Sequence, residues 1–175
     1  PMEPPVAIVR VQDGKAEAWA PVQPPRAARE GVASVLGLEL ENVTVHQTLL
    51  GGGFGRKSKP DFVSEAAWVA KAFEGRPVKL QWTREDDVQH AFFHAVSVDH
   101  LEASLDADGN ATGWLHRTLS PSIASLFAPD PEHKQAFELG MGLNTMPFDI
   151  PSVRLENPLA PAHVRIGWFR AVYNL

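Results

Sequence analysis

The sequence predicts a mixed α+β fold, in which the strands of a mixed sheet are interleaved with helices. Short apolar runs bounded by glycine or proline recur between residues 6 and 120, as is typical of strands. Between them lie two segments whose apolar residues are spaced by three and four, the pattern of helices with one buried face. Because 44% of the residues are apolar, the chain can also fill a core.

A β-hairpin opens the chain. Val6–Gln12 and Lys15–Trp19 are short apolar runs separated by Asp13 and Gly14. Asp-Gly between two such runs is a strong signal for a two-residue hairpin turn, because both turn positions need a positive φ. We therefore expect these two strands to be antiparallel neighbours.

Two amphipathic helices are predicted at Pro25–Leu36 and Asp61–Phe73. Gly37 and Gly75 follow them as C-terminal stop signals, and Pro60 stands at the start of the second. The apolar positions expected to face the core are Ala28, Val32, Val35 and Leu36 in the first helix and Phe62, Ala66, Val69 and Phe73 in the second.

Four further strands are expected at Val43–Leu49, Val78–Trp82, Val96–Leu105 and Thr112–Ser120. The last two surround a second hairpin turn with the sequence DADGN. Thr83 predicts a helix N-cap, because a threonine hydroxyl can accept a bond from a free N–H of the first turn. The acidic first turn that follows, which the helix dipole favours, is Glu85, Asp86 and Asp87.

The pattern weakens beyond Pro121. A helix is expected within Asp130–Leu143, although Gly140 and Gly142 loosen it, and Met146–Pro161 is interpreted as a proline-punctuated loop. Pro1 is not an initiator methionine, and the last residues resemble an interrupted strand, so we expect the chain to be a fragment of a longer protein.

Composition excludes several classes of protein. A net charge of −5, with 21% charged residues, argues against a nucleic-acid-binding protein. The absence of cysteine excludes a disulfide framework, a thiolate metal site and a cysteine nucleophile in this chain. No apolar run is long enough to predict a transmembrane segment, and the first residues lack a signal-peptide pattern.

The most unusual segment is Leu49–Lys59, LLGGGFGRKSK, between a predicted strand and a predicted helix. Backbone N–H groups before a helix form a ready site for anions, and glycine lets a ligand approach closely. A phosphate loop of the Walker type would have a glycine where Arg56 stands, before Lys57 and Ser58. The dinucleotide pattern fails at the same residue, so nucleotide binding is a weak alternative to a cofactor loop or a packed turn.

Other candidate sites are weaker. Arg56, Lys57 and Lys59 form a basic cluster that could contact a diphosphate or face solvent. His90 and His94 are four residues apart but lie across an expected helix-to-strand transition, and we predict no metal ligands in the chain. Ser120 and Ser122 have no recognisable His–Asp partners in the sequence.

An ordered series of motifs resembles a known family. The series is MEPP at Met2–Pro5, the hairpin with Trp19, GGGFGRK, and GRPVKLQWTREDD at Gly75–Asp87. It is similar to the molybdenum-binding subunit of the xanthine dehydrogenase and aldehyde oxidase hydroxylases. Within that family it most resembles the beta subunit of isoquinoline 1-oxidoreductase and related bacterial aldehyde dehydrogenases. The resemblance covers residues 2–122 and resumes at Ala160–Asn174.

The resemblance implies one molybdenum-cofactor-binding domain fragment over residues 1–175, with residues 1–122 as the well-matched part and 123–175 as a partly irregular segment. It implies that the backbone of Gly51, Gly52, Gly53, Phe54 and Gly55 approaches a molybdenum–pterin cofactor, expected as the molybdopterin cytosine dinucleotide form. By the same resemblance, GWFR at Gly167–Arg170 is a second contact, with Arg170 near the cofactor and Phe54 and Phe169 in the substrate funnel.

The resemblance also implies the activity of a parent enzyme. Purine-oxidising members carry a glutamate where this chain has Ser58, and an R-H-P segment where it has FHA at Phe93–Ala95. An aldehyde or N-heterocycle is therefore the expected substrate, hydroxylated with oxygen from water. The implied partner is a small 2Fe–2S iron–sulfur subunit, and the compartment is the bacterial cytoplasm or periplasm. No segment matches the family's catalytic glutamate, so we expect no catalytic residue here; the alternative for an isolated fragment is an inactive scaffold.

Overall fold

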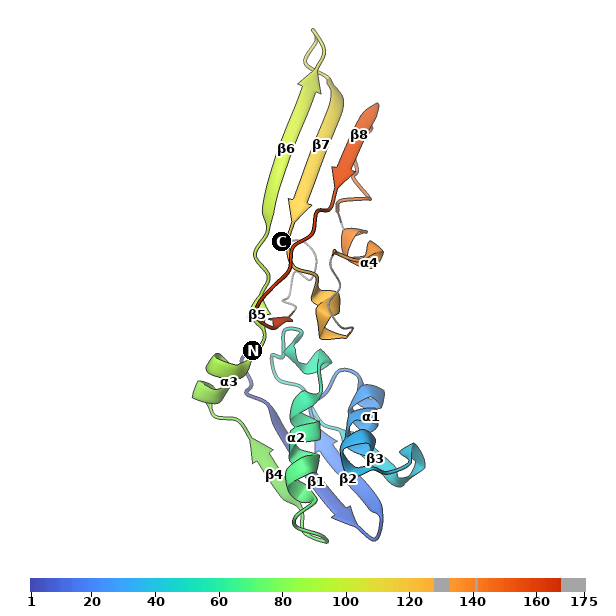
Figure 1. Cartoon of the computed structure of the whole chain (residues 1–175), viewed down its shortest axis with the longest axis vertical. Coiled ribbons are helices and arrows are strands. Elements are labelled where there is room, and N and C mark those ends of the chain that lie inside the picture. The colour runs from blue at the N-terminus through green and yellow to red at the C-terminus, as the bar shows by residue number, and fades with distance from the viewer. Residues whose placement is uncertain (128–132, 141, 168–175) are drawn as a thin grey trace. The chain divides into compact units, whose positions relative to one another are not determined.

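The computed structural model describes residues 1–127, 133–140 and 142–167 (Figure 1). The chain divides into two compact units, Pro1–Ala91 and Phe92–Leu175. The first unit contains the glycine loop, which lies between a strand and a helix of that unit.

A four-stranded mixed sheet in the order β3-β2-β1-β4 forms the first unit. The hairpin of β1 (Val6–Gln12) and β2 (Lys15–Ala20) is antiparallel, as predicted, and pairs Gln12 with Lys15 across the turn. Strand β3 (Val43–Gln47) runs parallel to β2, and β4 (Val78–Gln81) is antiparallel to β1. The parallel pair requires a crossover, which helix α1 supplies.

Helices α1 (Pro25–Leu36) and α2 (Asp61–Ala70) pack on each other and on the sheet (Figure 1). Helix α1 has the predicted bounds, and Gly37 ends it in the left-handed conformation at φ 68°. The side chains that fill the core between helices and sheet are Ala7, Val9, Ala16, Ala18, Ala20, Val22, Ala28, Val32, Ala33, Val43, Phe62, Val63, Ala66, Ala67 and Ala70. Most of them are small, so the helices can lie close to the strands.

Two further short elements belong to the first unit. The 3-10 turn η1 (Leu40–Asn42) leads into β3, and helix α3 (Arg84–His90) follows β4. Thr83 caps α3 as predicted: its hydroxyl accepts from the Asp86 N–H at 3.1 Å, and the Asp86 carboxylate accepts from the Thr83 N–H at 2.9 Å. This reciprocal capping box fixes where the helix begins.

The second unit is built on a three-stranded sheet in the order β6-β7-β8. Strands β6 (Val98–Leu105) and β7 (Ala111–Leu119) form the predicted hairpin, and β8 (Ser152–Glu156) runs parallel to β7. The remaining elements are the parallel pair β5 (Phe93–His94) and β9 (Ile166–Gly167), the 3-10 turn η3 (Ile123–Leu126) and helix α4 (Ala136–Leu139).

Some boundaries differ from the prediction. Strand β8 lies inside the segment interpreted as loop, because Ser152–Glu156 lies between prolines without containing one. Helix α4 is one turn long rather than most of Asp130–Leu143. Helix α2 ends at Ala70, and Phe73, expected in the core, is 48% exposed.

The mixed α+β fold with a mixed sheet and interleaved helices is confirmed. Within the described ranges, no helix combines the length and apolar character that crossing a membrane requires. The single-domain description of residues 1–175, with its division at residue 122, stays a prediction.

Candidate functional site

The glycine loop connects β3 to the 3-10 turn η2 (Arg56–Ser58), which leads into α2. Its backbone repeatedly enters the left-handed region, with φ 61° at Gly52, 47° at Phe54 and 91° at Gly55. A bulky residue such as phenylalanine rarely adopts a positive φ, because its Cβ crowds the backbone. The loop therefore holds Phe54 in an unfavourable backbone conformation, with the side chain 47% exposed.

Consecutive N–H groups in the loop are available to a ligand. Those of Gly52, Gly53, Phe54 and Gly55 donate no hydrogen bond to any residue that the structure describes. By contrast, the N–H groups of Arg56 and Ser58 bond to the carbonyls of Gly53 and Gly55 at 2.9 and 3.0 Å. Successive N–H groups in a turn with left-handed residues form a concavity suited to anions.

The N-terminal segment lies against this loop. The Met2 N–H donates to the Gly52 carbonyl at 2.9 Å, and the Glu3 carboxylate accepts from the Gly51 N–H at 2.6 Å. A Cβ at Gly52 would lie 2.9 Å from the Met2 Cβ. The glycine at this position thus allows both the left-handed backbone and the close approach of Met2.

Lys57, in the basic cluster, is fully buried beneath the loop. Its Nζ donates to the Pro4 carbonyl at 3.3 Å, lies 3.9 Å from a Glu3 carboxylate oxygen and stands 4.8 Å from the centre of the Phe62 ring. Burial lowers the pKa of the Lys57 ammonium below its ordinary value, while the charge of Glu3 acts in the opposite direction. The sequence left two alternatives for the basic cluster, contact with a diphosphate or exposure to solvent. Lys57 does neither, because its ammonium is buried against Glu3 and Pro4.

Arg56 is also turned inward, with 7% of its surface exposed. Its guanidinium binds the Asp61 carboxylate through two bonds of 2.7 and 3.0 Å and lies 5.5 Å from the centre of the Trp82 ring. Two parallel bonds to a carboxylate are among the stronger polar contacts in proteins. Arg56, which breaks the Walker pattern, therefore anchors the loop to the start of α2.

Ser58, the residue from which a non-purine substrate is expected, also stabilises the loop. Its hydroxyl donates to the Gly55 carbonyl, the same atom that accepts from the Ser58 N–H. A Cβ at Gly53 would lie 2.8 Å from the Lys57 Cγ, so a larger residue there would displace the buried lysine. The phosphate-loop alternative gains no support, because Lys57 directs its ammonium inward.

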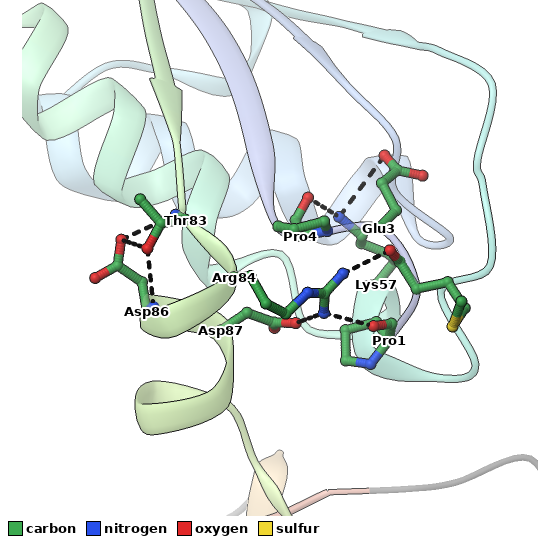
Figure 2. Close-up of polar contacts among 9 residues, drawn as sticks. Pro1, Glu3, Pro4, Lys57, Thr83, Arg84, Asp86 and Asp87 are labelled. Carbon is green, nitrogen blue, oxygen red and sulfur yellow. Dashed lines mark hydrogen bonds and ion pairs between the residues drawn. The ribbon is translucent and has the colours of Figure 1, made fainter.

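Helix α3 holds the other side of the N-terminal segment (Figure 2). The Arg84 guanidinium donates to the carbonyls of Pro1 at 2.8 Å and Met2 at 2.7 Å, and to the Asp87 carboxylate at 2.7 Å. Asp87 is 2% exposed. The acidic first turn of α3 was expected to interact with the helix dipole. One of its residues, Asp87, is also a buried partner for Arg84.

The sequence pattern indicated the glycine loop, but it did not indicate which residues fix the loop and the N-terminal segment beside it. Glu3 and Arg84 lie in the MEPP and REDD motifs, yet spacing along the chain gave no sign that Glu3 reaches Gly51 and Lys57 or that Arg84 reaches the carbonyls before Glu3. Phe169 and Arg170 lie outside the described residues. Among the residues described, no three histidine, aspartate or glutamate side chains are grouped so as to hold a metal ion.

Fold and loop together define a domain with consecutive backbone N–H groups that the described residues leave unused. The family model of the molybdopterin cofactor-binding domain matches residues 1–172. The chain is 31% identical to the isoquinoline 1-oxidoreductase subunit beta of Brevundimonas diminuta, over 98% of this chain and 22% of that protein. It is also 31% identical to a membrane-bound aldehyde dehydrogenase (pyrroloquinoline-quinone) of Gluconacetobacter polyoxogenes, over 98% of this chain and 23% of that protein.

A solved structure agrees in fold. The aldehyde oxidoreductase of Desulfovibrio gigas superimposes with a TM-score of 0.77 at 23% identity, over 99% of this chain and 19% of that one. The chain therefore belongs to the molybdopterin cofactor-binding domain family, which confirms the resemblance seen in the motifs. It spans 22% and 23% of the lengths of the two relatives named above.

The residues of the loop fit a molybdenum–pterin cofactor. Such a group is anionic, and residues 52–55 offer N–H groups that the described residues leave unused. The side chains of Lys57 and Arg56 pair with Glu3 and Asp61, whereas the backbone dipoles of residues 52–55 stay unused by the described residues.

Proposed function

We propose that this chain holds a molybdenum–pterin cofactor against the backbone of Gly51–Gly55, as one part of an oxidoreductase. The parent enzyme hydroxylates an aldehyde or an N-heterocycle with oxygen from water and passes the electrons to iron–sulfur clusters. The observation that carries the proposal is the run of unused N–H groups at Gly52, Gly53, Phe54 and Gly55, in a chain of the molybdopterin cofactor-binding family.

The roles of the residues follow from the geometry of the loop. N–H groups fixed before a ligand arrives bind an anion without the reorganisation that water or a mobile side chain would need. The exposed ring of Phe54 stands on the same turn, so it is suited to line the path by which an apolar substrate reaches the cofactor. When bound, the cofactor supplies two-electron oxidation; the chain supplies orientation and dry packing around it.

The finer features of the proposal come from the family resemblance. They are the cytosine dinucleotide form of the cofactor, a small 2Fe–2S partner subunit, and contacts from Phe169 and Arg170. Ser58 supports a substrate other than a purine, because its hydroxyl is directed to the Gly55 carbonyl and a carboxylate is absent there. We propose no catalytic residue in this chain.

Cofactor analysis of the full-length protein tests the proposal. The protein should be purified from a host that makes the molybdenum cofactor and then analysed for metal, for pterin fluorescence after denaturation and for the released nucleotide. We expect molybdenum and pterin in equal amounts, with cytosine dinucleotide. A quinone chromophore without molybdenum, or a folded protein with none of these groups, would contradict the proposal; the second result would favour a scaffold.

Turnover assays then address the substrate. With an artificial electron acceptor, we expect oxidation of aldehydes or of aromatic N-heterocycles and none of xanthine. Oxygen-18 from labelled water should appear in the product. Efficient oxidation of xanthine would contradict the role given to Ser58.

A further inference from the structure

The pair Glu3 and Lys57 stands apart from the groups that would touch a cofactor. Glu3 uses its carboxylate twice: Oε2 accepts from the Gly51 N–H at 2.6 Å, and Oε1 faces the Lys57 Nζ at 3.9 Å. Lys57 in turn donates to the Pro4 carbonyl at 3.3 Å. Through these two side chains the N-terminal segment is tied to both ends of the loop, before and after its unused N–H groups. Figure 2 shows the contacts of Lys57 with Glu3 and Pro4.

A fully buried lysine needs an explanation, because burying an ammonium is costly unless charge and hydrogen bonds compensate for the lost water. Lys57 has 0% of its side chain exposed, and the Glu3 side chain 26%. An apolar residue of the same length would fill the space beside Phe62 without that cost. The charge is therefore retained for something other than stability.

We propose that Glu3 and Lys57 are positioning residues, which fix the glycine loop in the conformation that keeps the N–H groups of residues 52–55 turned to a ligand. The inference rests on the proposed function for its consequence, since the ligand is the anionic cofactor. The geometry itself stands without it: Glu3 holds the Gly51 end of the loop, and Lys57 follows the Gly55 end.

Three variants of the full-length protein separate positioning from stability. Lys57→Met removes the ammonium but keeps the apolar stem. Glu3→Gln keeps an acceptor for the Gly51 N–H but loses the charge, and Glu3→Ala removes both. Glu30→Ala is the matched control, because Glu30 pairs with Arg26 at 2.9 Å on the surface of the same unit, away from the loop.

Hydrogen exchange of peptides covering residues 49–55, followed by mass spectrometry, is the first readout. Losing a hydrogen bond to a charged group should speed exchange in this loop about tenfold or more in Glu3→Ala. Lys57→Met and Glu3→Gln should give smaller increases, because each removes the ion pair but keeps an acceptor for the Gly51 N–H; Lys57→Met also loses the bond to the Pro4 carbonyl. Glu30→Ala should match the wild type.

Unfolding and cofactor content are the second and third readouts. We expect Lys57→Met to keep or raise the denaturant midpoint, because the buried charge is gone, while its loop exchanges faster and its molybdenum content falls. A purely structural lysine would lower the midpoint and leave the loop of the folded protein unchanged.

Two results would overturn the inference: unchanged loop exchange in Glu3→Ala, or full molybdenum content in both Glu3→Ala and Lys57→Met. Failure of the proposed function looks different. In that case the wild type itself would carry neither molybdenum nor pterin, while the exchange measurements would still report on the pair.

Discussion

The two units of the chain are stabilised in different ways. In the first, α1 and α2 cover a four-stranded sheet and enclose a continuous apolar core that includes Val9, Val32 and Phe62. In the second, every residue of β6 is exposed, and the apolar cluster found among the described residues consists of Ala95, Ile123 and Ile166. Its buried Glu138 instead accepts bonds from the Ser122 hydroxyl and from the N–H groups of Ile123 and Gln135.

This difference explains where a strained loop can be supported. Holding Phe54 at a positive φ and burying Lys57 both cost free energy, and such costs persist only where the surroundings fix the conformation. The first unit provides this support through its core and through the contacts of Arg56 and Glu3. Four predictions would break or sharpen the contrast between the units.

The largest effect is expected in the apolar core. Phe62→Ala should lower the free energy of unfolding by about 4 kcal/mol, because it removes a fully buried ring and leaves a cavity. Phe93→Ala, in the second unit, should cost less than about 1 kcal/mol, since Phe93 is 52% exposed. Denaturant unfolding measures both, and equal losses would contradict the contrast.

The second-largest effect is expected at Glu138, the polar support of the second unit. Glu138→Ala should cost about 3 kcal/mol, because two buried donors and one part-buried donor lose their acceptor. Glu102→Ala is the control: its side chain is 64% exposed and pairs with His100 on the surface. Hydrogen exchange restricted to peptides of residues 98–127 should report the loss, and no change there would show that the carboxylate is not a support.

A smaller effect of opposite sign is expected at Phe54. Asparagine tolerates the left-handed region better, so Phe54→Asn should leave stability unchanged or raise it by up to about 1 kcal/mol. Catalytic activity of the full-length protein should nevertheless fall, because the exposed ring is lost from the cofactor loop. A clear loss of stability would mean that the φ of 47° is not strained.

The smallest effect concerns pH. Because burial lowers the pKa of Lys57 below 10.5, the folded protein releases this proton at a lower pH than the unfolded chain. Stability should therefore rise with pH in the window below 10.5. Lys57→Met should lack this rise, so its advantage over the wild type should shrink as the pH increases. A difference that stays constant with pH would contradict the lowered pKa of the buried Lys57 ammonium.

Much of the first unit was predictable because its signals are local. The Asp13-Gly14 turn, the apolar face of Pro25–Leu36 and the Thr83 cap each depend on neighbouring residues, and each is confirmed. Strand β8 was missed because a short strand between prolines has no local signal that separates it from a loop. The same limit applies to the site: the glycines are visible in the sequence, but the meeting of Glu3 with Lys57 depends on tertiary structure.

One comparison of two glycines tests most directly whether the loop backbone holds the cofactor. Gly52 and Gly37 have similar positive φ values of 61° and 68°, so alanine strains both backbones. Gly52 lies in the loop, where an added Cβ would also stand 2.9 Å from the Met2 Cβ, whereas a Cβ at Gly37 would meet open space. Molybdenum and pterin should be measured per folded molecule of the full-length protein. We expect Gly37→Ala to retain the wild-type content and Gly52→Ala to lose most of it. Equal content in the two variants would contradict a cofactor bound by this backbone.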